Sequence, residues 1–333
     1  MRAAVHRAGG PAAAVLTVEE VERPEPGIGE VRVAIHYSGI NPTDVRARGE
    51  TSAAPSGTFR IPHQDGSGFV DAVGPGVDEG LLGRAVWVYH AALGRTSGTA
   101  AEWVSLPVSR VVALPERVDL RTGACLGVPA LTAHLCAFDA EVRMRGNVRD
   151  GAVLVTGGAG AVGSAAVQLL RWAGALVIAT ASTEEKAFAA RAAGAAHVIR
   201  YREEDVSAEL AAIVPEGLRR VVDVALARNL DTYADRLAPG AVVAAYAGGD
   251  TRPAVPMRAF MRRNASLRFV HVYGAEHDRL ASAIRDVSAA LADGALAPVA
   301  TTVLPLERIA EAHELVEAGT FGRVLVELRP STG

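Results

Sequence analysis

Gly151-Ala-Val-Leu-Val-Thr-Gly-Gly-Ala-Gly-Ala-Val-Gly163 is the stretch that decides the fold. It joins a short apolar run to a glycine-rich turn with the pattern Gly158-x-Gly160-x-x-Gly163. Apolar residues then recur at helical spacing until Gly174, at Val162, Ala165, Ala166, Leu169, Leu170 and Ala173. A second apolar run follows at Leu176–Thr180. The segment therefore predicts a strand, a tight turn, a helix and a second strand.

The glycines are spaced as in the nucleotide-binding half of a Rossmann unit. Gly158 is expected to allow the tight turn, Gly160 to let the backbone approach a pyrophosphate, and Gly163 to let the helix lie close to the strand. Free N–H groups and the positive end of the helix would then hold the phosphates. We therefore predict a dinucleotide site formed by Gly158, Ala159, Gly160, Ala161, Val162 and Gly163.

The end of the second strand indicates which dinucleotide binds. NAD sites usually place an acidic residue there, about 20 residues past the glycines, to bind the ribose 2′-OH. Here Ala181-Ser-Thr183 occupy that stretch, and Lys186, the only lysine of the chain, is a mobile cation suited to a phosphate. Together with Ser182 and with Tyr201 after the third strand, Lys186 favours NADPH. The alternative is that Lys186 is a solvated residue of a helical first turn, beside two glutamates.

The composition limits the remaining function classes. A length of 333 residues suggests about two domains, and the net charge of −3 without a basic block gives no indication of nucleic acid or of an anionic membrane. No signal peptide and no run of 18 apolar residues is present, so a cytoplasmic location is expected. Cys125 and Cys136 form no CxxC pair, which excludes a four-cysteine zinc site.

The two ends of the chain differ in pattern from its middle. Residues 1 to about 120 are predicted as antiparallel β-structure with loops, because Val31, Val33, Ile35 and Tyr37 alternate as in a half-buried strand. Strands and helices alternate in the middle, with strands expected at 197–201, 221–225, 241–246 and 266–273 and helices at 184–193, 206–213 and 229–237. This alternation predicts an α/β fold with a doubly wound parallel sheet. The tail from residue 275 is predicted to rejoin the first domain.

Several motifs resemble those of one superfamily. They are Ser38-Gly-Ile-Asn-Pro-Thr-Asp44, Gly123–Ala133, Val155–Gly163, Pro305–Glu314 and Gly322–Val326. They are similar to motifs of the medium-chain dehydrogenase/reductase superfamily, in particular its zinc-independent quinone oxidoreductase family, which includes zeta-crystallin. The resemblance implies a GroES-like β-rich catalytic domain at residues 1–123 and 274–333 and a Rossmann domain at 124–273.

The resemblance also bears on metal binding. Zinc-bearing members have a cysteine where Asn41 stands and a His-Glu pair where Gln64-Asp65 stands. Asparagine and glutamine are not competent zinc ligands, and His63 is one position early without a cysteine partner. No metal site is therefore predicted.

Roles for other residues are implied by the resemblance alone. NADPH would lie across the interdomain cleft, with Asn41, Asp44 and Arg46 as catalytic candidates near the nicotinamide and substrate. Asn41 and Asp44 also suit a turn, and Arg46, where relatives often have tyrosine, could equally be a solvated residue. The residues expected near the cofactor are Thr132, Asn229, Tyr246, Ala247, Gly248, Val270, His271 and Val272.

The predicted function is an NADPH-dependent reductase that transfers a hydride to a quinone or a related activated enone without zinc. The alternatives are an enal or enoyl C=C reductase of a biosynthetic pathway and a non-enzymatic NADPH-binding protein. A small-molecule substrate and no nucleic acid or membrane partner are expected. The last Rossmann strand, 266–273, is expected at the sheet edge, where it would pair with its twin in a homodimer.

Overall fold

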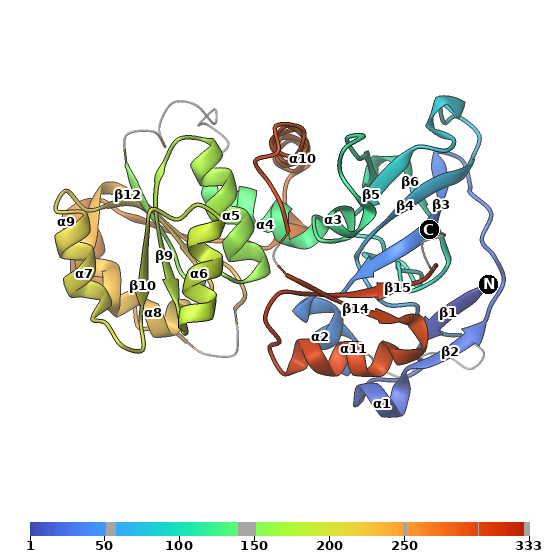
Figure 1. Cartoon of the computed structure of the whole chain (residues 1–333), viewed down its shortest axis with the longest axis horizontal. Coiled ribbons are helices and arrows are strands. Elements are labelled where there is room, and N and C mark those ends of the chain that lie inside the picture. The colour runs from blue at the N-terminus through green and yellow to red at the C-terminus, as the bar shows by residue number, and fades with distance from the viewer. Residues whose placement is uncertain (51–57, 139–150, 249–251, 299, 330–333) are drawn as a thin grey trace. The chain divides into compact units, whose positions relative to one another are not determined.

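The computed structural model describes residues 1–50, 58–138, 151–248, 252–298 and 300–329 (Figure 1). The chain forms two compact units. The first contains Met1–Val128 and Ala300–Gly333, and the second contains Pro129–Val299.

The second unit is built on a parallel six-stranded sheet. Its spatial order is β10-β9-β8-β11-β12-β13, and every neighbouring pair is parallel. The strands are β8 (Ala152–Val155), β9 (Leu176–Ala181), β10 (His197–Arg200), β11 (Leu218–Asp223), β12 (Leu237–Ala245) and β13 (Ser266–Phe269). β9 and β10 are thus added on one side of β8, and β11, β12 and β13 are then added on its other side. This order confirms the predicted doubly wound fold.

Helices connect these strands, and one more helix, α10, follows the last of them. They are α5 (Ala161–Trp172), α6 (Glu184–Ala192), α7 (Val206–Ile213), α8 (Leu226–Tyr233), α9 (Met257–Arg263) and α10 (His277–Ala292). Helices α5 and α6 lie on the near face of the sheet in Figure 1. Since parallel crossovers are right-handed, reversal of the strand order between β8 and β11 places the later crossover helices on the other face.

Two strand predictions differ from the structure. The last strand was expected to reach Tyr273, but β13 ends at Phe269 because its partner β12 ends at Ala245 and offers no further ladder. Val272–Gly274 then form a 3₁₀ turn. Pro239-Gly240 was expected to precede a strand, whereas both residues lie inside β12, where the register with β11 shifts.

The first unit is mainly a seven-stranded sheet. β3 (Glu30–Gly39) lies at its centre, between β15 and β4, and also pairs with β6. The other strands are β4 (Asp65–Val73), β5 (Ala85–Val88), β6 (Trp103–Pro107), β7 (Val111–Ala113), β14 (Thr301–Pro305) and β15 (Arg323–Glu327), and β1 (Arg2–Val5) pairs separately with β2 (Thr17–Glu20). β3 is buried on both faces, whereas the sequence predicts a half-buried strand.

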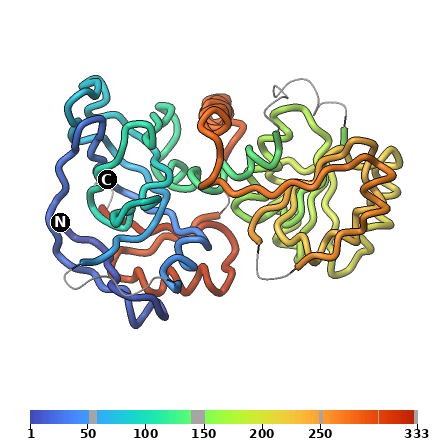
Figure 2. Tube along the Cα trace, turned by 180° about the vertical axis from the view of Figure 1, so that it is seen from behind, coloured from blue at the N-terminus to red at the C-terminus, as the bar shows by residue number. Residues whose placement is uncertain are grey.

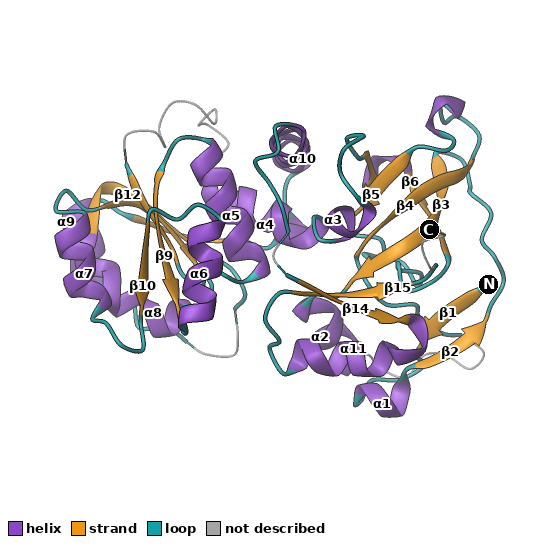
Figure 3. Ribbon diagram, in the orientation of Figure 1, coloured by secondary structure: helices purple, strands orange, loops and turns teal. Residues whose placement is uncertain are grey.

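Few helices belong to the first unit. They are α1 (Ala12–Val15), α2 (Pro42–Glu50), α3 (Leu120–Ala124) and α11 (Ile309–Glu317), and α4 (Gly127–Ala137) begins in it. Figure 3 shows the resulting contrast between the strand-rich first unit and the alternating second unit. Apolar side chains from β3, β5, β6 and β15 form the core of the first unit together with residues of α11.

The return to the first unit occurs later than residue 274, the start of the predicted tail. Helix α10 belongs to the second unit, where it contacts α5. Gln168 exchanges two hydrogen bonds with the backbone of Ala297, each 2.8 Å, and Trp172 Nε1 donates to Asp293 Oδ2 at 3.0 Å. Figure 2, seen from behind, shows the segment after β13 leading into this helix. These contacts hold residues 274–298 with the second unit.

Among the described residues, no helix combines the length and the apolar character needed to span a membrane.

Candidate functional site

The glycine loop after β8 has the geometry of a phosphate-binding turn. Gly157, rather than the predicted Gly158, makes the turn, with φ of 65°. A Cβ on Gly158 would lie 2.6 Å from the Cβ of Ala179 in β9, and one on Gly163 would lie 2.2 Å from the carbonyl oxygen of Gly157. Gly158 therefore allows close packing against β9, and Gly163 allows α5 to approach the loop.

The start of α5 offers free donors. Its N-cap, Gly160, has no side chain, and the N–H of Ser164 is the first to bond back, to the carbonyl of Gly160 at 2.8 Å. In the described part of the chain, the N–H groups of Ala161, Val162 and Gly163 have no protein acceptor. Three unpaired N–H groups at the positive end of a 12-residue helix are suited to hold an anion.

Thr180 secures this loop, and sequence reasoning gave it no role. Its hydroxyl accepts from Gly157 N at 3.1 Å, and its carbonyl accepts from Gly158 N at 3.0 Å. Thr180 lies in β9 and is 5% exposed. The amides of Gly157 and Gly158 are thus used inside the protein and are not available to a ligand anion.

The residues predicted to choose the cofactor lie at the end of β9. Ser182 and Lys186 are partly exposed, and Tyr201, after β10, is 49% exposed. Thr183 caps α6 by accepting from Lys186 N at 3.3 Å. Lys186 is therefore in the first turn of α6, and its side chain can reach solvent.

Glu184, one of the two glutamates beside Lys186, is engaged by two arginines. Arg191 Nη1 donates to its carboxylate at 2.8 Å, and Arg200 Nη1 lies 3.5 Å away. The hydrogen bond from Arg191 lowers the pKa of Glu184. These cations offset the acidic charge that would otherwise oppose a phosphate near Lys186.

A second feature of this unit is the buried carboxylate of Asp223, at the carboxyl end of β11. It is 0% exposed. Its Oδ1 accepts from Thr156 Oγ1 at 2.9 Å, from Ala225 N at 2.8 Å and from Asn229 Nδ2 at 2.8 Å, and its Oδ2 accepts from Tyr233 OH at 2.6 Å. Asn229, predicted near the cofactor, is thus held by a residue that sequence reasoning did not select.

The remaining residues expected near the cofactor lie in the same unit. Tyr246, Ala247 and Gly248 follow β12, and Ala247 has φ of 55°, a left-handed conformation that costs energy in a non-glycine residue. Thr132 is buried in α4, and Val272 is buried in the 3₁₀ turn. Val270 N donates to Ala245 O at 2.8 Å, whereas His271 lies beyond the strand and is exposed.

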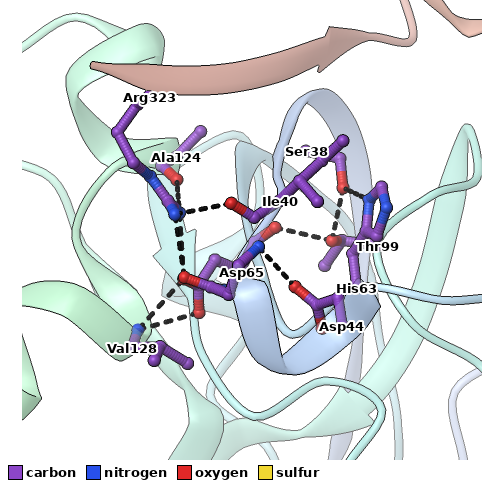
Figure 4. Close-up of polar contacts among 10 residues, drawn as sticks. Ser38, Ile40, Asp44, His63, Asp65, Thr99, Ala124, Val128 and Arg323 are labelled. Carbon is purple, nitrogen blue, oxygen red and sulfur yellow. Dashed lines mark hydrogen bonds and ion pairs between the residues drawn. The ribbon is translucent and has the colours of Figure 1, made fainter. Parts of the chain in front are cut away.

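The first unit holds a different cluster, centred on Asp65 and Arg323 (Figure 4). Asp65 is 0% exposed, and Arg323 Nη2 lies 3.2 Å from its Oδ2. Asn41 Nδ2 donates to the same oxygen at 2.8 Å, and Val128 N donates to both carboxylate oxygens, at 2.9 and 3.0 Å. Arg323 Nη1 donates to Asn41 Oδ1 at 2.8 Å and to Ile40 O at 2.7 Å. Asp65 thereby ties together β4, β15, the start of α2 and the start of α4.

Asp44 lies beside this cluster in the first turn of α2. Its Oδ2 accepts from Asn41 N at 2.7 Å, the reciprocal half of a capping box. Burial raises the pKa of Asp44 to about 7, and the nearby Asp65 carboxyl adds to the rise. Of the two carboxyls, Asp65 has the guanidinium, so Asp44 is the one that holds a proton near neutral pH.

The three catalytic candidates therefore have different surroundings. Asn41 is 1% and Asp44 is 4% exposed, and the amide of Asn41 is engaged at both its oxygen and its nitrogen. The predicted turn at Asn41–Asp44 is the capped start of a helix. Arg46 lies on the same helix with an exposed side chain.

A chain of buried hydrogen bonds extends from this cluster to α11. His63 Nδ1 lies 2.8 Å from Ser38 Oγ, and its Nε2 lies 2.9 Å from His313 Nε2. Ser38 Oγ is 2.7 Å from Thr99 Oγ1, and Thr99 donates to the carbonyl of Asp65 at 2.6 Å. His313 Nδ1 lies 3.3 Å from Arg48 Nη1.

The two ends of this chain determine the positions of its protons. Arg48 can only donate, so His313 Nδ1 accepts and His313 carries its proton on Nε2. His63 then accepts at Nε2 and donates from Nδ1 to Ser38. Burial lowers the pKa of His63 well below its usual value and that of His313 to about 3, so both imidazoles are neutral. His63 itself has φ of 81°, and these hydrogen bonds hold its strained backbone.

The position of the Arg323 guanidinium is relevant to whether this cluster could bind a metal ion. It lies against Asn41 and Asp65, two of the positions where zinc-bearing members have ligands, so a metal ion would compete with it for the same carboxylate. Within the described ranges, no three His, Cys, Asp or Glu side chains are grouped as metal ligands.

Comparison with known proteins extends this description. Residues 27–116 match the family model of the alcohol dehydrogenase GroES-like domain, and residues 161–305 match the zinc-binding dehydrogenase model. A quinone oxidoreductase from Sus scrofa is 29% identical over 97% of this chain and 96% of its own length.

Solved structures of other proteins resemble this chain over 98% or more of its length. A crystal structure of an NAD-dependent alcohol dehydrogenase is 30% identical with a TM-score of 0.84, covering 99% of this chain and 100% of that one. A mycobacterial protein complexed with NADPH is 26% identical with a TM-score of 0.82, covering 98% of this chain and 100% of that one.

Proposed function

Since the chain belongs to the medium-chain dehydrogenase/reductase superfamily and is an oxidoreductase, we propose that it reduces a quinone or a related activated enone with NADPH and without zinc. The observation that carries this proposal is the anion site formed by the free N–H groups of Ala161, Val162 and Gly163. A dinucleotide pyrophosphate has the charge and size for that site. NADPH supplies the hydride when it is bound, and the residues of the chain bind and orient the reactants.

The preference for NADPH rests on the residues after β9. Ser182 and Lys186 lie where an NAD site would have an acid, and the charge of Glu184 is offset by Arg191 and Arg200. A mobile ammonium in the first turn of α6 can meet a 2′-phosphate, and the phenol of Tyr201 can add a hydrogen bond. The pocket therefore suits the phosphorylated cofactor better than NADH.

Replacement of the single lysine tests this preference. We expect Lys186→Ala to raise the KM for NADPH by at least about tenfold, because a charged contact to the 2′-phosphate is lost, while the KM for NADH stays within about twofold. Arg262→Ala, which removes an exposed cation from α9 in the same unit, is the matched control and should change neither value. Equal changes for both cofactors in Lys186→Ala would remove Lys186 from the proposed pocket.

The nicotinamide is proposed to lie at the carboxyl ends of β11 and β12, near the backbone of Tyr246, Ala247 and Gly248. Ligands of open α/β sheets bind outside these strand ends, and the left-handed backbone of Ala247 is a strain of the kind retained at functional sites. Thr132, Asn229, Val270, His271 and Val272 complete the proposed surroundings. The exposure of His271 leaves it accessible to solvent protons.

The hydride acceptor is proposed to bind to the first unit beside Asn41, Asp44 and Arg46. The first two are buried and hydrogen-bonded, so they fix the start of α2. The exposed guanidinium of Arg46 can stabilise negative charge that develops on a quinone or enone oxygen.

The direct experiment follows NADPH absorbance with purified protein and a panel of quinones, enals and enoyl thioesters. Turnover with quinones or simple enones is expected. Turnover confined to enoyl thioesters would instead indicate a C=C reductase of a biosynthetic pathway. Binding of NADPH without turnover of any acceptor would contradict the assignment as a quinone or enone reductase.

A homodimer through β13 is part of the proposal. β13 is an edge strand, and Phe269 at its end is 71% exposed; Met257 and Met261 of α9, the helix before β13, are 68 and 70% exposed. An exposed apolar sheet edge is a liability unless it is covered, and two-fold pairing with a second copy would cover it. Light scattering should give the dimer mass for the wild type and the monomer mass for Phe269→Asp.

A further inference from the structure

We infer that Asp223 is a positioning residue for the nicotinamide half of the dinucleotide. It would act through Thr156, Asn229 and the backbone at residues 224–225 rather than by touching the cofactor. This inference rests on the proposed dinucleotide function and adds to it a residue that holds the site in shape.

The carboxylate of Asp223 is buried and fully hydrogen-bonded. Asp223 is 0% exposed, and its four donors come from three places: the end of β8, the loop after β11, and α8. The hydroxyl of Thr156 is used twice, since it donates to Asp223 and accepts from Val224 N at 3.0 Å. Each partner is therefore fixed in direction as well as in distance.

Asp223 lies at the point of the sheet where the ladder between β8 and β11 ends. The β8–β11 ladder ends at Val155 opposite Val222, and Thr156 N then donates to Val222 O at 2.9 Å. Beyond that point the side chains of Thr156 and Asp223 continue the connection between the two strands. β8 and β11 are the strands between which the order of the sheet reverses, and ligands of doubly wound sheets bind outside their carboxyl ends.

Burial of the Asp223 carboxylate costs free energy. A carboxylate that is removed from water without a cation partner costs free energy unless hydrogen bonds compensate for the lost hydration. Here the hydroxyl of Tyr233, two side-chain donors and one backbone N–H take the place of a cation. Such a network fixes the orientation of the groups that surround it. Tyr233 itself is 0% exposed and belongs to the inner layer of the network.

The donors to Asp223 come from other elements than the proposed adenine side of the site. There the loop amides bond to Thr180 of β9, and the proposed 2′-phosphate contacts come from residues after β9 and β10. None of the four donors to Asp223 lies in β9, β10 or α6. Loss of Asp223 should therefore affect the nicotinamide half and leave the adenine half intact.

The test measures binding of two ligands by titration calorimetry. NADPH spans both halves of the site, whereas 2′,5′-ADP occupies only the adenine half. For Asp223→Asn we expect the affinity for NADPH to fall by at least about tenfold and that for 2′,5′-ADP to stay within about twofold. The KM values for NADPH and NADH should rise by the same factor, which distinguishes Asp223 from Lys186.

Thr156 provides a matched pair if Asp223→Asn does not fold. Thr156→Val keeps the shape but loses both hydrogen bonds, and Thr156→Ser keeps the hydroxyl. The valine variant should lose NADPH affinity selectively, and the serine variant should restore it. Unchanged NADPH affinity in folded Asp223→Asn or Thr156→Val, or equal losses for both ligands, would overturn the inference. A wild-type chain that bound neither ligand would instead contradict the proposed function.

Discussion

Asp65 and Asp223 are two fully buried carboxylates that the two units stabilise in different ways. Asp65 faces the guanidinium of Arg323 together with the amide of Asn41 and the N–H of Val128. Asp223 has only neutral donors, from hydroxyl, amide and backbone groups. The first arrangement joins four segments through a charge pair, and the second aligns two strand ends through hydrogen bonds. Removal of a charge should therefore have different consequences in the two units.

The largest expected effect comes from neutralising each carboxylate in turn. Asp65→Asn leaves the 4%-exposed guanidinium of Arg323 without a counter-ion, so we expect a loss of about 3–5 kcal/mol in the free energy of unfolding. Asp223→Asn leaves no opposite charge behind, and its neutral donors lose an acceptor, so we expect a loss of about 1–3 kcal/mol. Urea unfolding followed by circular dichroism measures both.

Arg323 supplies the control for this comparison. Arg323→Met leaves the buried Asp65 carboxylate without a cation. The loss in the free energy of unfolding should be as large as that for Asp65→Asn. The double variant Asp65→Asn/Arg323→Met removes both charges and should cost less than the sum of the single variants. Additive losses would show that the two side chains do not act as a pair.

The next effect is a pH dependence confined to the first unit. With a pKa of about 3 in the folded chain and 6.5 when unfolded, His313 binds a proton only in the unfolded chain between those values, so it destabilises the fold as the pH falls. Asp44, with a folded pKa of about 7 against 3.8, holds a proton only in the folded chain in that window, so it stabilises the fold as the pH falls. The two effects oppose each other in the wild type.

Single variants separate these contributions. On going from pH 7 to pH 5, His313→Gln should lose about 2 kcal/mol less of its unfolding free energy than the wild type. Asp44→Asn should lose about 2 kcal/mol more. Tyr233→Phe is the control from the second unit, because burial raises the pKa of its phenol away from this range, and its pH dependence should match that of the wild type. Identical slopes in all four proteins would contradict the neutral histidine pair and the protonated Asp44.

The smallest effect is expected from the same Tyr233→Phe variant at neutral pH. It removes one of four donors and leaves Asp223 Oδ2 without its hydroxyl partner, so we expect a loss of about 1–2 kcal/mol. The loss should nearly vanish in an Asp223→Asn background, where the acceptor is already altered. A loss that persists there would mean that Tyr233 contributes by packing rather than through the carboxylate.

The two clusters also show which features of the structure could be predicted from the sequence and which could not. The phosphate loop, the helix that follows it and the alternation of strands and helices were predictable, because each depends on the periodicity of neighbouring residues. The pair Asp65–Arg323 was not, since 258 positions separate its members and neither belongs to a local pattern. Asp223 was included only in a predicted strand, because nothing in the sequence shows that Thr156 and Tyr233 meet there.

The errors at element ends have a similar origin. β13 ends where its partner β12 ends. The apolar run 266–273 cannot show this end, because it depends on the length of β12. The boundary of the first unit shifted from 274 to 300 because Gln168 and Trp172 hold the segment after α10, and such contacts leave no periodic signal. Asn41 and Asp44 were selected as catalytic candidates from the resemblance, and their burial could not be deduced from their spacing.

The single lysine has a practical consequence. The only other amine of the given sequence is the α-amino group of Met1, which donates to Val21 O at 2.7 Å and pairs with Glu20. Acylating reagents would therefore modify one ε-amine, at the first turn of α6. A fluorophore or a solid support can thus be attached at a single defined point without protein engineering, and shielding of that amine would report directly on whatever occupies its surroundings.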